Sequence, residues 1–132
     1  MIDIPRLLAE LYRWVGVPFR HQGRTRAGVD CAGLLLAGLA EQGVHVAAPA
    51  NYHPSAAATL LLAELEASPL FEPRNGPPER GDVLVFRIRR AAQHLAVALG
   101  SDAMIHATRD GVNAVTIGPL WRQRLAQRYG WR

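Results

Sequence analysis

The stretch GVDCAGLLLAG, residues 28–38, marks a change from an irregular loop to a helix. Asp30 can accept hydrogen bonds from the free N–H groups of a first helical turn. A leucine-rich run follows and Gly43 is a natural stop, so we expect a helix from Cys31 to about Gln42. Cys31 would then lie where the helix dipole and free amides stabilise a thiolate.

Upstream of this helix, the sequence predicts a loop and another helix. Residues 16–30 are rich in glycine and arginine, which is typical of a loop. Residues 4–15 have apolar side chains at helical spacing behind Asp3, a possible cap. Downstream, Ser55 is expected to cap a third helix through residue 65.

The pattern changes after residues 72–81, which are expected to form a turn region rich in proline and glycine. Four short segments rich in β-branched residues follow, at residues 82–88, 94–100, 103–107 and 112–117. They predict an antiparallel sheet, and the aromatic tail is expected to pack back on it. Helices followed by strands predict one α+β domain over residues 1–132.

Cys31, the single cysteine of the chain, has two interpretations. A lone cysteine beside an apolar helix is usually a small core residue. Its expected place in a first helical turn, with Gly28 and Gly33 close by, favours a reactive nucleophile instead. Its own N–H could then donate to an oxyanion.

Two histidines are candidate partners of this thiol. Strand alternation places His94 on one face with Ala96 and Ala98, where small side chains would leave room for a helix. Imidazole is the natural base for a thiol near pH 7. His106 on the next strand could lie beside His94 and fix its tautomer. Surface and core roles stay open for both, whereas the spacing of Cys31, His94 and His106 gives little support for zinc.

The charge of the chain bears on which kinds of molecule it could bind. All 15 basic residues are arginines, the formal net charge is +4 and the sequence pI is about 10.2. Such a surface suits any anionic partner, including nucleic acid, an anionic membrane or a cell-wall polymer. Because no basic stripe with interleaved aromatics is present, we expect no nucleic-acid partner. No apolar run reaches the ~20 residues of a membrane span. We also expect no secretory signal and no metal or cofactor.

Two blocks of the sequence, residues 13–44 and 80–107, resemble the NlpC-type cell-wall cysteine peptidases. The motifs that carry this likeness are VPF at 17–19, DCAGL at 30–34, GDVLVF at 81–86, HLAV at 94–97 and IHA at 105–107. The resemblance implies a papain-like fold, with the nucleophile at a helix N-terminus and N-terminal helices packed on a C-terminal antiparallel sheet. It also implies hydrolysis of amide bonds in peptidoglycan stem peptides, often between D-glutamate and a diamino acid.

Carried over by motif, the resemblance implies Cys31 as nucleophile, His94 as base and His106 as the residue that orients it. Asp30 matches an acidic residue that helps to bind the substrate's amine. Phe19 stands where the family has a tyrosine, and we expect it at the substrate site.

The glycine- and arginine-rich loop supplies the remaining expected substrate contacts. Arg24 and Arg26 could bind stem-peptide carboxylates through paired N–H bonds, and His21 could border the site. This loop and the tail at 120–132 also resemble a compact subgroup encoded with phage tails and gene-transfer particles. Phage tail proteins are therefore expected partners. The expected location is the bacterial cytoplasm, where the chain would be made, followed by incorporation into a virion or tail-like particle.

Three other functions stay open from the sequence. The chain could be a catalytically silent assembly component of a tail particle. It could also be an N-acetylmuramoyl amidase or an acyltransferase on the same fold.

Overall fold

The computed structural model describes residues 1–46, 57–88 and 92–132. The helices are α1 (Ile4–Tyr12), α2 (Cys31–Ala40), α3 (Ala57–Glu66) and α4 (Pro119–Arg124). The strands are β1 (Arg24–Thr25), β2 (Gly28–Val29), β3 (Phe71–Arg74), β4 (Val83–Arg87), β5 (Ala92–Ala98), β6 (Ala103–Thr108), β7 (Gly111–Thr116) and β8 (Leu125–Trp131). The expected cap Ser55 lies outside the described residues.

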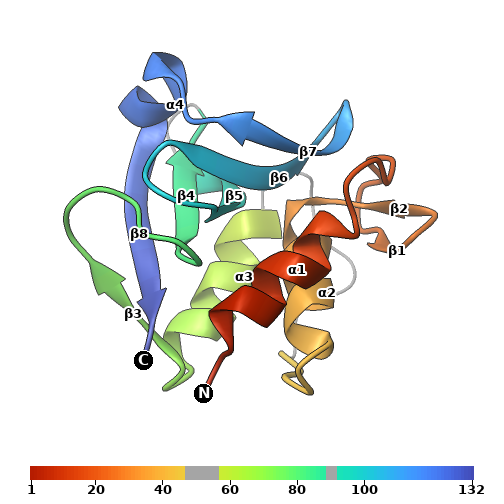
Figure 1. The fold of residues 1–132 in the computed structure, drawn as a ribbon, viewed down its shortest axis with the longest axis horizontal. Coiled ribbons are helices and arrows are strands. Elements are labelled where there is room, and N and C mark those ends of the chain that lie inside the picture. The colour runs from red at the N-terminus through yellow and green to blue at the C-terminus, as the bar shows by residue number, and fades with distance from the viewer. Residues whose placement is uncertain (47–56, 89–91) are drawn as a thin grey trace.

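The main sheet has six strands in the order β3-β8-β4-β5-β6-β7, and its neighbours run antiparallel. A separate hairpin pairs β1 with β2. The four predicted strands are confirmed as β4 to β7, and so is the α+β class. In Figure 1 the helices α1, α2 and α3 lie together, and α4 lies at the opposite end of the view.

Strands β3 and β8 were not predicted as strands. The sequence places residues 72–74 in a turn region, yet they belong to β3, an edge strand that contains Pro73. The tail does pack back, but as β8 inserted between β3 and β4. A buried ion pair of 2.7 Å joins Arg128 of β8 to Asp82 beside β4. Such pairing between distant segments leaves no local pattern in the sequence.

Helices α1 and α2 pack closely because one of them presents a glycine. A Cβ atom on Gly38 would lie 2.8 Å from a methyl group of Leu7 and 2.9 Å from one of Leu11. Helix α1 was expected to continue to residue 15, but it ends at Tyr12, and Val15 is 45% exposed. Val15 keeps the helical spacing of apolar residues although it lies beyond the end of the helix and is not buried, and for this reason the sequence pattern predicts a longer helix.

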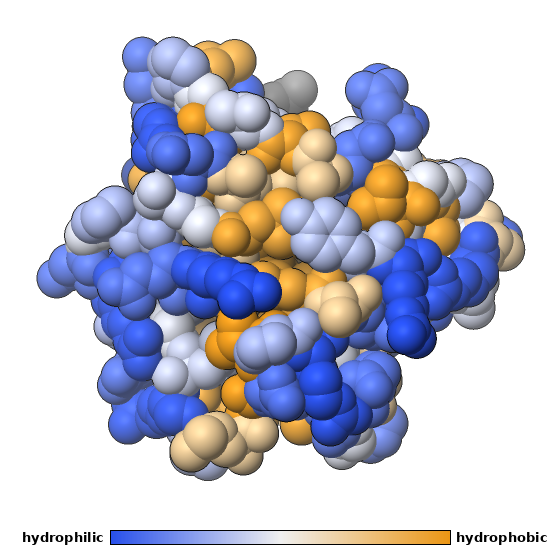
Figure 2. Space-filling view, in the orientation of Figure 1, coloured by the Kyte–Doolittle hydropathy of each residue, from blue (hydrophilic) through white to orange (hydrophobic). Residues whose placement is uncertain are grey.

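The sheet separates two apolar layers. On one face, Leu95 and Val97 of β5 join the core formed with α1, α2 and α3. On the other face, Ala96 and Ala98 join a smaller cluster that Trp121 of α4 covers. Figure 2 shows polar side chains around the edge of the helix-bearing side and apolar side chains in its middle. The alternation predicted for β5 is confirmed.

Candidate active site

The loop before α2 is tied to the first turn of that helix. One carboxylate oxygen of Asp30 accepts the Gly33 N–H at 2.7 Å, and the other accepts the Gln22 N–H at 3.0 Å. A Cβ atom on Gly33 would lie 2.2 Å from the carbonyl oxygen of Gly23, so glycine is needed for this approach. The cap prediction for Asp30 is confirmed, and the helix start at Cys31 is fixed.

Cys31 lies on the boundary between α2 and the sheet. Its side chain is 9% exposed and borders an apolar cavity of about 10 Å³ together with Leu34, Leu95 and Ile105. Burial raises the pKa of the Cys31 thiol to about 11, although a hydrogen bond from the backbone N–H of Leu95 acts in the opposite direction. The expectation of a partial thiolate at neutral pH is therefore wrong for the free protein: burial outweighs the helix dipole.

The thiol reaches Leu95 because strands β5 and β6 separate. Their ladder consists of two pairs, Val97 with Ile105 and Ala98 with Met104. Beyond these two pairs, backbone N–H groups of β5 that point towards β6 can donate to groups other than the β6 backbone. The N–H of Leu95 faces that side by alternation, and it acts on the Cys31 sulfur.

The two predicted histidines meet across the same opening. His94 Nε2 lies 2.9 Å from His106 Nδ1, and the ring planes are inclined at 67°. Burial, and then the neighbouring His106, lowers the pKa of His94 to about 3. Burial also lowers the pKa of His106. Both rings are neutral at pH 7, and Nδ1 is the nitrogen of His94 left for a reaction.

Trp121 of α4 packs on both rings. Its centroid lies 5.4 Å from that of His94, at an interplanar angle of 30°, and 5.4 Å from that of His106. Phe86 meets Trp121 edge-on at 4.9 Å. The small side chains beside His94 therefore make room for Trp121, whereas α2 packs on the opposite face, which corrects the expected approach of the nucleophile helix. From the sequence, Trp121 was expected only as part of a tail that packs back on the sheet.

Arg26 has a different place from the one expected. Its guanidinium lies 4.4 Å from the centroid of Trp14, 3.7 Å from a carboxylate oxygen of Glu10, and donates to the carbonyl of Arg13. All three partners belong to α1 or to the turn after it. In the structure Arg26 joins the β1–β2 hairpin to α1, a contact that local sequence could not reveal, and its expected substrate contact stays a prediction.

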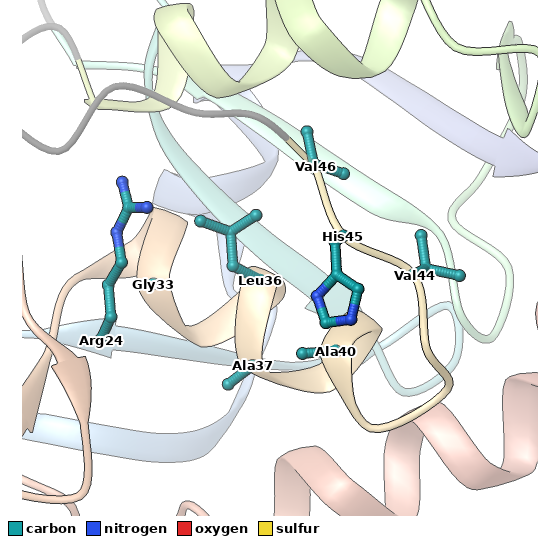
Figure 3. Close-up of a pocket in the computed structure, with 8 residues that line it drawn as sticks. All are labelled: Arg24, Gly33, Leu36, Ala37, Ala40, Val44, His45 and Val46. Carbon is teal, nitrogen blue, oxygen red and sulfur yellow. The ribbon is translucent and has the colours of Figure 1, made fainter.

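Arg24, on the same hairpin, borders a cavity of about 240 Å³ on the outer side of α2. Figure 3 shows Arg24 at one end of this cavity and His45, between Val44 and Val46, at the other. Gly33 also lines it, two residues after Cys31 in the chain. Arg24 thus lies beside the nucleophile helix, whereas Arg26 lies against α1 and the turn after it.

Phe19 and His21 lie at the rim of the nucleophile loop. Phe19 is 39% exposed and forms a β-bridge with Val29, two residues before Cys31. His21 is half-buried in the turn that follows Phe19.

Within residues 1–46, 57–88 and 92–132, no group of three or more His, Cys, Asp or Glu side chains is arranged to hold a metal ion. No helix there is long and apolar enough to cross a bilayer. No hydrogen bond between the Cys31 thiol and His94 is found in that part of the chain. Burial raises the pKa of the thiol and lowers the pKa of His94, so burial favours the neutral form of both groups.

Known proteins resemble this chain in sequence. The model of the NlpC/P60 family matches residues 16–129. Among curated proteins, the chain is 24% identical over 127 residues to a murein DD-endopeptidase/LD-carboxypeptidase of Escherichia coli, MepS, covering 93% of this chain. The chain spans 61% of the length of that relative.

Solved structures show the same fold. The NlpC/p60 domain of the peptidoglycan hydrolase SagA superposes with a TM-score of 0.70 at 19% identity, covering 98% of this chain and 99% of that one. A lipoprotein-like NLP/P60 protein of Staphylococcus aureus gives a TM-score of 0.71 at 17% identity, with coverage of 98% and 42%. The peptidoglycan hydrolase RipB of Mycobacterium tuberculosis gives 0.65 at 19% identity, with coverage of 96% and 62%.

Proposed function

The chain belongs to the NlpC/P60 family, and on that premise we propose that it is a cysteine-type hydrolase of peptidoglycan stem peptides. The observation that carries the proposal is the opening between β5 and β6. There the thiol at the start of α2 meets the amide of Leu95, next to His94, and His94 bonds His106 at 2.9 Å. A nucleophile, a base and a group that orients the base are the parts of a catalytic triad.

The first step starts from neutral groups. With its proton on Nε2, His94 donates to His106 Nδ1 and keeps Nδ1 as an acceptor. The Cys31 sulfur attacks the amide carbon while its proton passes to His94 Nδ1. The carbonyl oxygen becomes an oxyanion that accepts from the N–H of Cys31, a donor at a helix N-terminus. The N–H of Leu95 stabilises negative charge on sulfur as it develops.

The second step releases the amine. The carbon–nitrogen bond breaks, the imidazolium of His94 returns its proton to the leaving nitrogen, and a thioester remains on Cys31. Water then loses a proton to His94 and attacks the thioester. The thiol regains the proton, and the acyl fragment leaves as a carboxylic acid.

The finer assignment is the bond between D-glutamate and a diamino acid, as the sequence motifs imply. Arg24 supports it, since a guanidinium beside α2 can bind a stem-peptide carboxylate on the acyl side. A bond between cross-linked peptides is a second candidate, because the name of the E. coli relative includes DD-endopeptidase. We further propose association with a phage tail-like particle, testable by mass spectrometry of purified particles.

The deciding experiment digests purified muropeptides with the wild-type chain and with the Cys31→Ala variant. We expect wild type to release fragments that end in a new D-glutamate carboxyl group, identified by mass, and the variant to release none. Products cut between sugar and peptide would instead identify an N-acetylmuramoyl amidase. If wild type and variant give the same empty product list, the chain is an assembly component.

A further inference from the structure

Helix α4 joins β7 to β8 and bridges two fixed points of the sheet (Figure 1). Before it, the N–H of the buried Ile117 donates to the carbonyl of Asp102, in the connection between β5 and β6, at 2.7 Å. After it, Leu125 begins β8 and pairs with Phe86 of β4. No residue of α4 itself is buried, and no side chain caps its start. The helix is therefore anchored at both ends but weakly packed between them.

Trp121 is the residue of α4 that packs on the imidazole pair. Its ring centroid lies 5.4 Å from that of His94 and 5.4 Å from that of His106. The preceding residue, Leu120, adds little packing, because 59% of it is exposed. Whether Trp121 stays on the two imidazoles thus depends on how firmly α4 is held over the sheet.

The side chain of Arg122 ties this helix to the strands that carry the histidines. Its Nη2 atom donates to the Asp102 carboxylate at 2.9 Å and to the carbonyl of Ser101 at 3.0 Å. Both acceptors lie in the connection between β5 and β6, and these two strands contain His94 and His106. The tie therefore fixes the residue next to Trp121 relative to the imidazoles.

We propose that Arg122 is a positioning residue: its bonds to Asp102 and Ser101 hold α4, and with it Trp121, against the imidazole pair. The catalytic consequence rests on the proposed function, which makes His94 the base and His106 the group that orients it. The hold on Trp121 itself does not depend on that function.

The tie is weak enough to be released without unfolding the domain. The side chains of Arg122 and Asp102 are 44% and 84% exposed, and an exposed ion pair changes an equilibrium by up to about fivefold. Its loss should therefore increase the fraction of molecules in which α4 has lifted from the sheet. Because Trp121 keeps water from the imidazoles, they take up a proton mainly in that uncovered state, and their proton affinity follows its population.

Histidine ring shifts across pH test the proposal on wild type and Arg122→Met. We expect the variant to bind a proton on the imidazole pair up to about fivefold more tightly. Arg122→Lys should restore the wild-type affinity, since a single nitrogen makes both bonds and an ammonium group can replace it. Arg124→Met, an equal loss of charge on the same helix, is the matched control and should behave as wild type.

Asp102→Ala separates release of the helix from a change in charge. Loss of a carboxylate should by itself weaken proton binding to an imidazole, whereas release of α4 strengthens it. We expect stronger binding, and no further increase in the double variant Arg122→Met/Asp102→Ala, since both changes break the same contact. Weaker or unchanged binding in Asp102→Ala, or an increase in Arg124→Met equal to that in Arg122→Met, overturns the inference.

Muropeptide turnover is measured separately on the same proteins. Arg122→Met should lower kcat by up to about fivefold and leave KM unchanged, because the imidazoles are held less well and no substrate contact is removed. No turnover by wild type refutes the proposed function, while the proton affinities still decide the role of Arg122. A raised KM with an unchanged kcat would make Arg122 a substrate-binding residue and overturn the inference.

Discussion

Strands β5 and β6 are a regular ladder over one half of their length and an open site over the other half. In the paired half, Val97 lies opposite Ile105 and Ala98 opposite Met104. In the open half, the amide of Leu95 faces the Cys31 thiol, and His94 bonds His106 through their side chains. The two halves belong to the same strands and have the same alternation. Backbone hydrogen bonds join the strands in the paired half, whereas side chains take the place of those bonds in the open half.

The comparison shows how a sheet can hold a reactive site without leaving buried polar groups unpaired. An unpartnered buried amide costs roughly 1–3 kcal/mol, so an opened ladder needs other acceptors and donors. The thiol and the imidazole pair supply them, and Trp121 covers the imidazoles. The proposed chemistry and the stability of the fold therefore depend on the same groups.

The largest effect is expected from the base. His94→Ala should reduce muropeptide turnover at least about 1,000-fold, because it removes both the proton acceptor and the donor to the leaving amine. His106→Gln should retain measurable turnover, since a carboxamide can still accept from His94 Nε2. Initial rates by chromatography measure both. Equal losses in the two variants would mean that His106 takes part in proton transfer itself.

Thiol alkylation tests the chemistry of the open half. Because burial raises the pKa of Cys31 to about 11, the native thiol should react with iodoacetamide at pH 7 at least ~100-fold more slowly than a free cysteine peptide. The rate should rise about tenfold per pH unit up to pH 9. Protein unfolded in urea is the control and should react at the ordinary rate. A plateau between pH 5 and 8 would instead indicate a thiolate–imidazolium pair.

Acid should destabilise the fold through His94. Its pKa falls to about 3 in the folded state, so the unfolded chain binds a proton more readily below the ordinary value of 6.5. The stability that the neutral His94 ring gives to the folded state is fully present above pH 6.5. As the pH falls from 6.5 towards 3, the free energy of unfolding decreases by up to about 1.4 kcal/mol per pH unit. Urea unfolding between pH 7 and 4 measures it, and His94→Gln should show a shallower dependence. Parallel curves for the two proteins would remove His94 as the cause.

Removing the aromatic cover should expose the imidazole pair. Trp121→Leu should raise the pKa of both histidines towards the ordinary value and lower turnover about tenfold, as expected for a general base held less well. Histidine ring shifts across pH report the pKa change, which a purely structural role would not produce. Trp121→Phe should restore most of the activity. Trp131→Phe, at the other end of the sheet, is the matched control, and a similar pKa change in that variant would argue against a local effect.

The smallest effect is expected outside both halves, in the β1–β2 hairpin. Arg26→Ala should lower the free energy of unfolding by about 1 kcal/mol, since it removes the contact with Trp14 and an exposed ion pair. It should leave KM unchanged. Arg24→Ala should instead raise KM several-fold, because it removes a contact with a substrate carboxylate, and should leave the free energy of unfolding unchanged. Urea titrations and steady-state kinetics separate the two, and a raised KM in Arg26→Ala would restore its predicted substrate role.

The sequence by itself determined the helix that begins at Cys31, the alternation of β5 and the α+β class. These features follow from local rules: a cap, a helical or two-residue period, and a turn residue. The same rules made Cys31, His94 and His106 candidates, Cys31 at a helix start and the two histidines within strands. They also assigned Asp30 as a cap, which its bond to Gly33 confirms.

Only the tertiary structure decided how those residues meet. The separation of β5 from β6, the cover by Trp121 and the insertion of β8 join segments far apart in the chain, and no local pattern encodes them. The burial that makes Cys31 a neutral thiol is likewise a property of the packed core, and it outweighs the helix dipole from which the sequence predicted a thiolate. Arg24 and Arg26 look alike in sequence. In the structure Arg26 packs against α1 and the turn after it, whereas Arg24 lines a cavity beside α2.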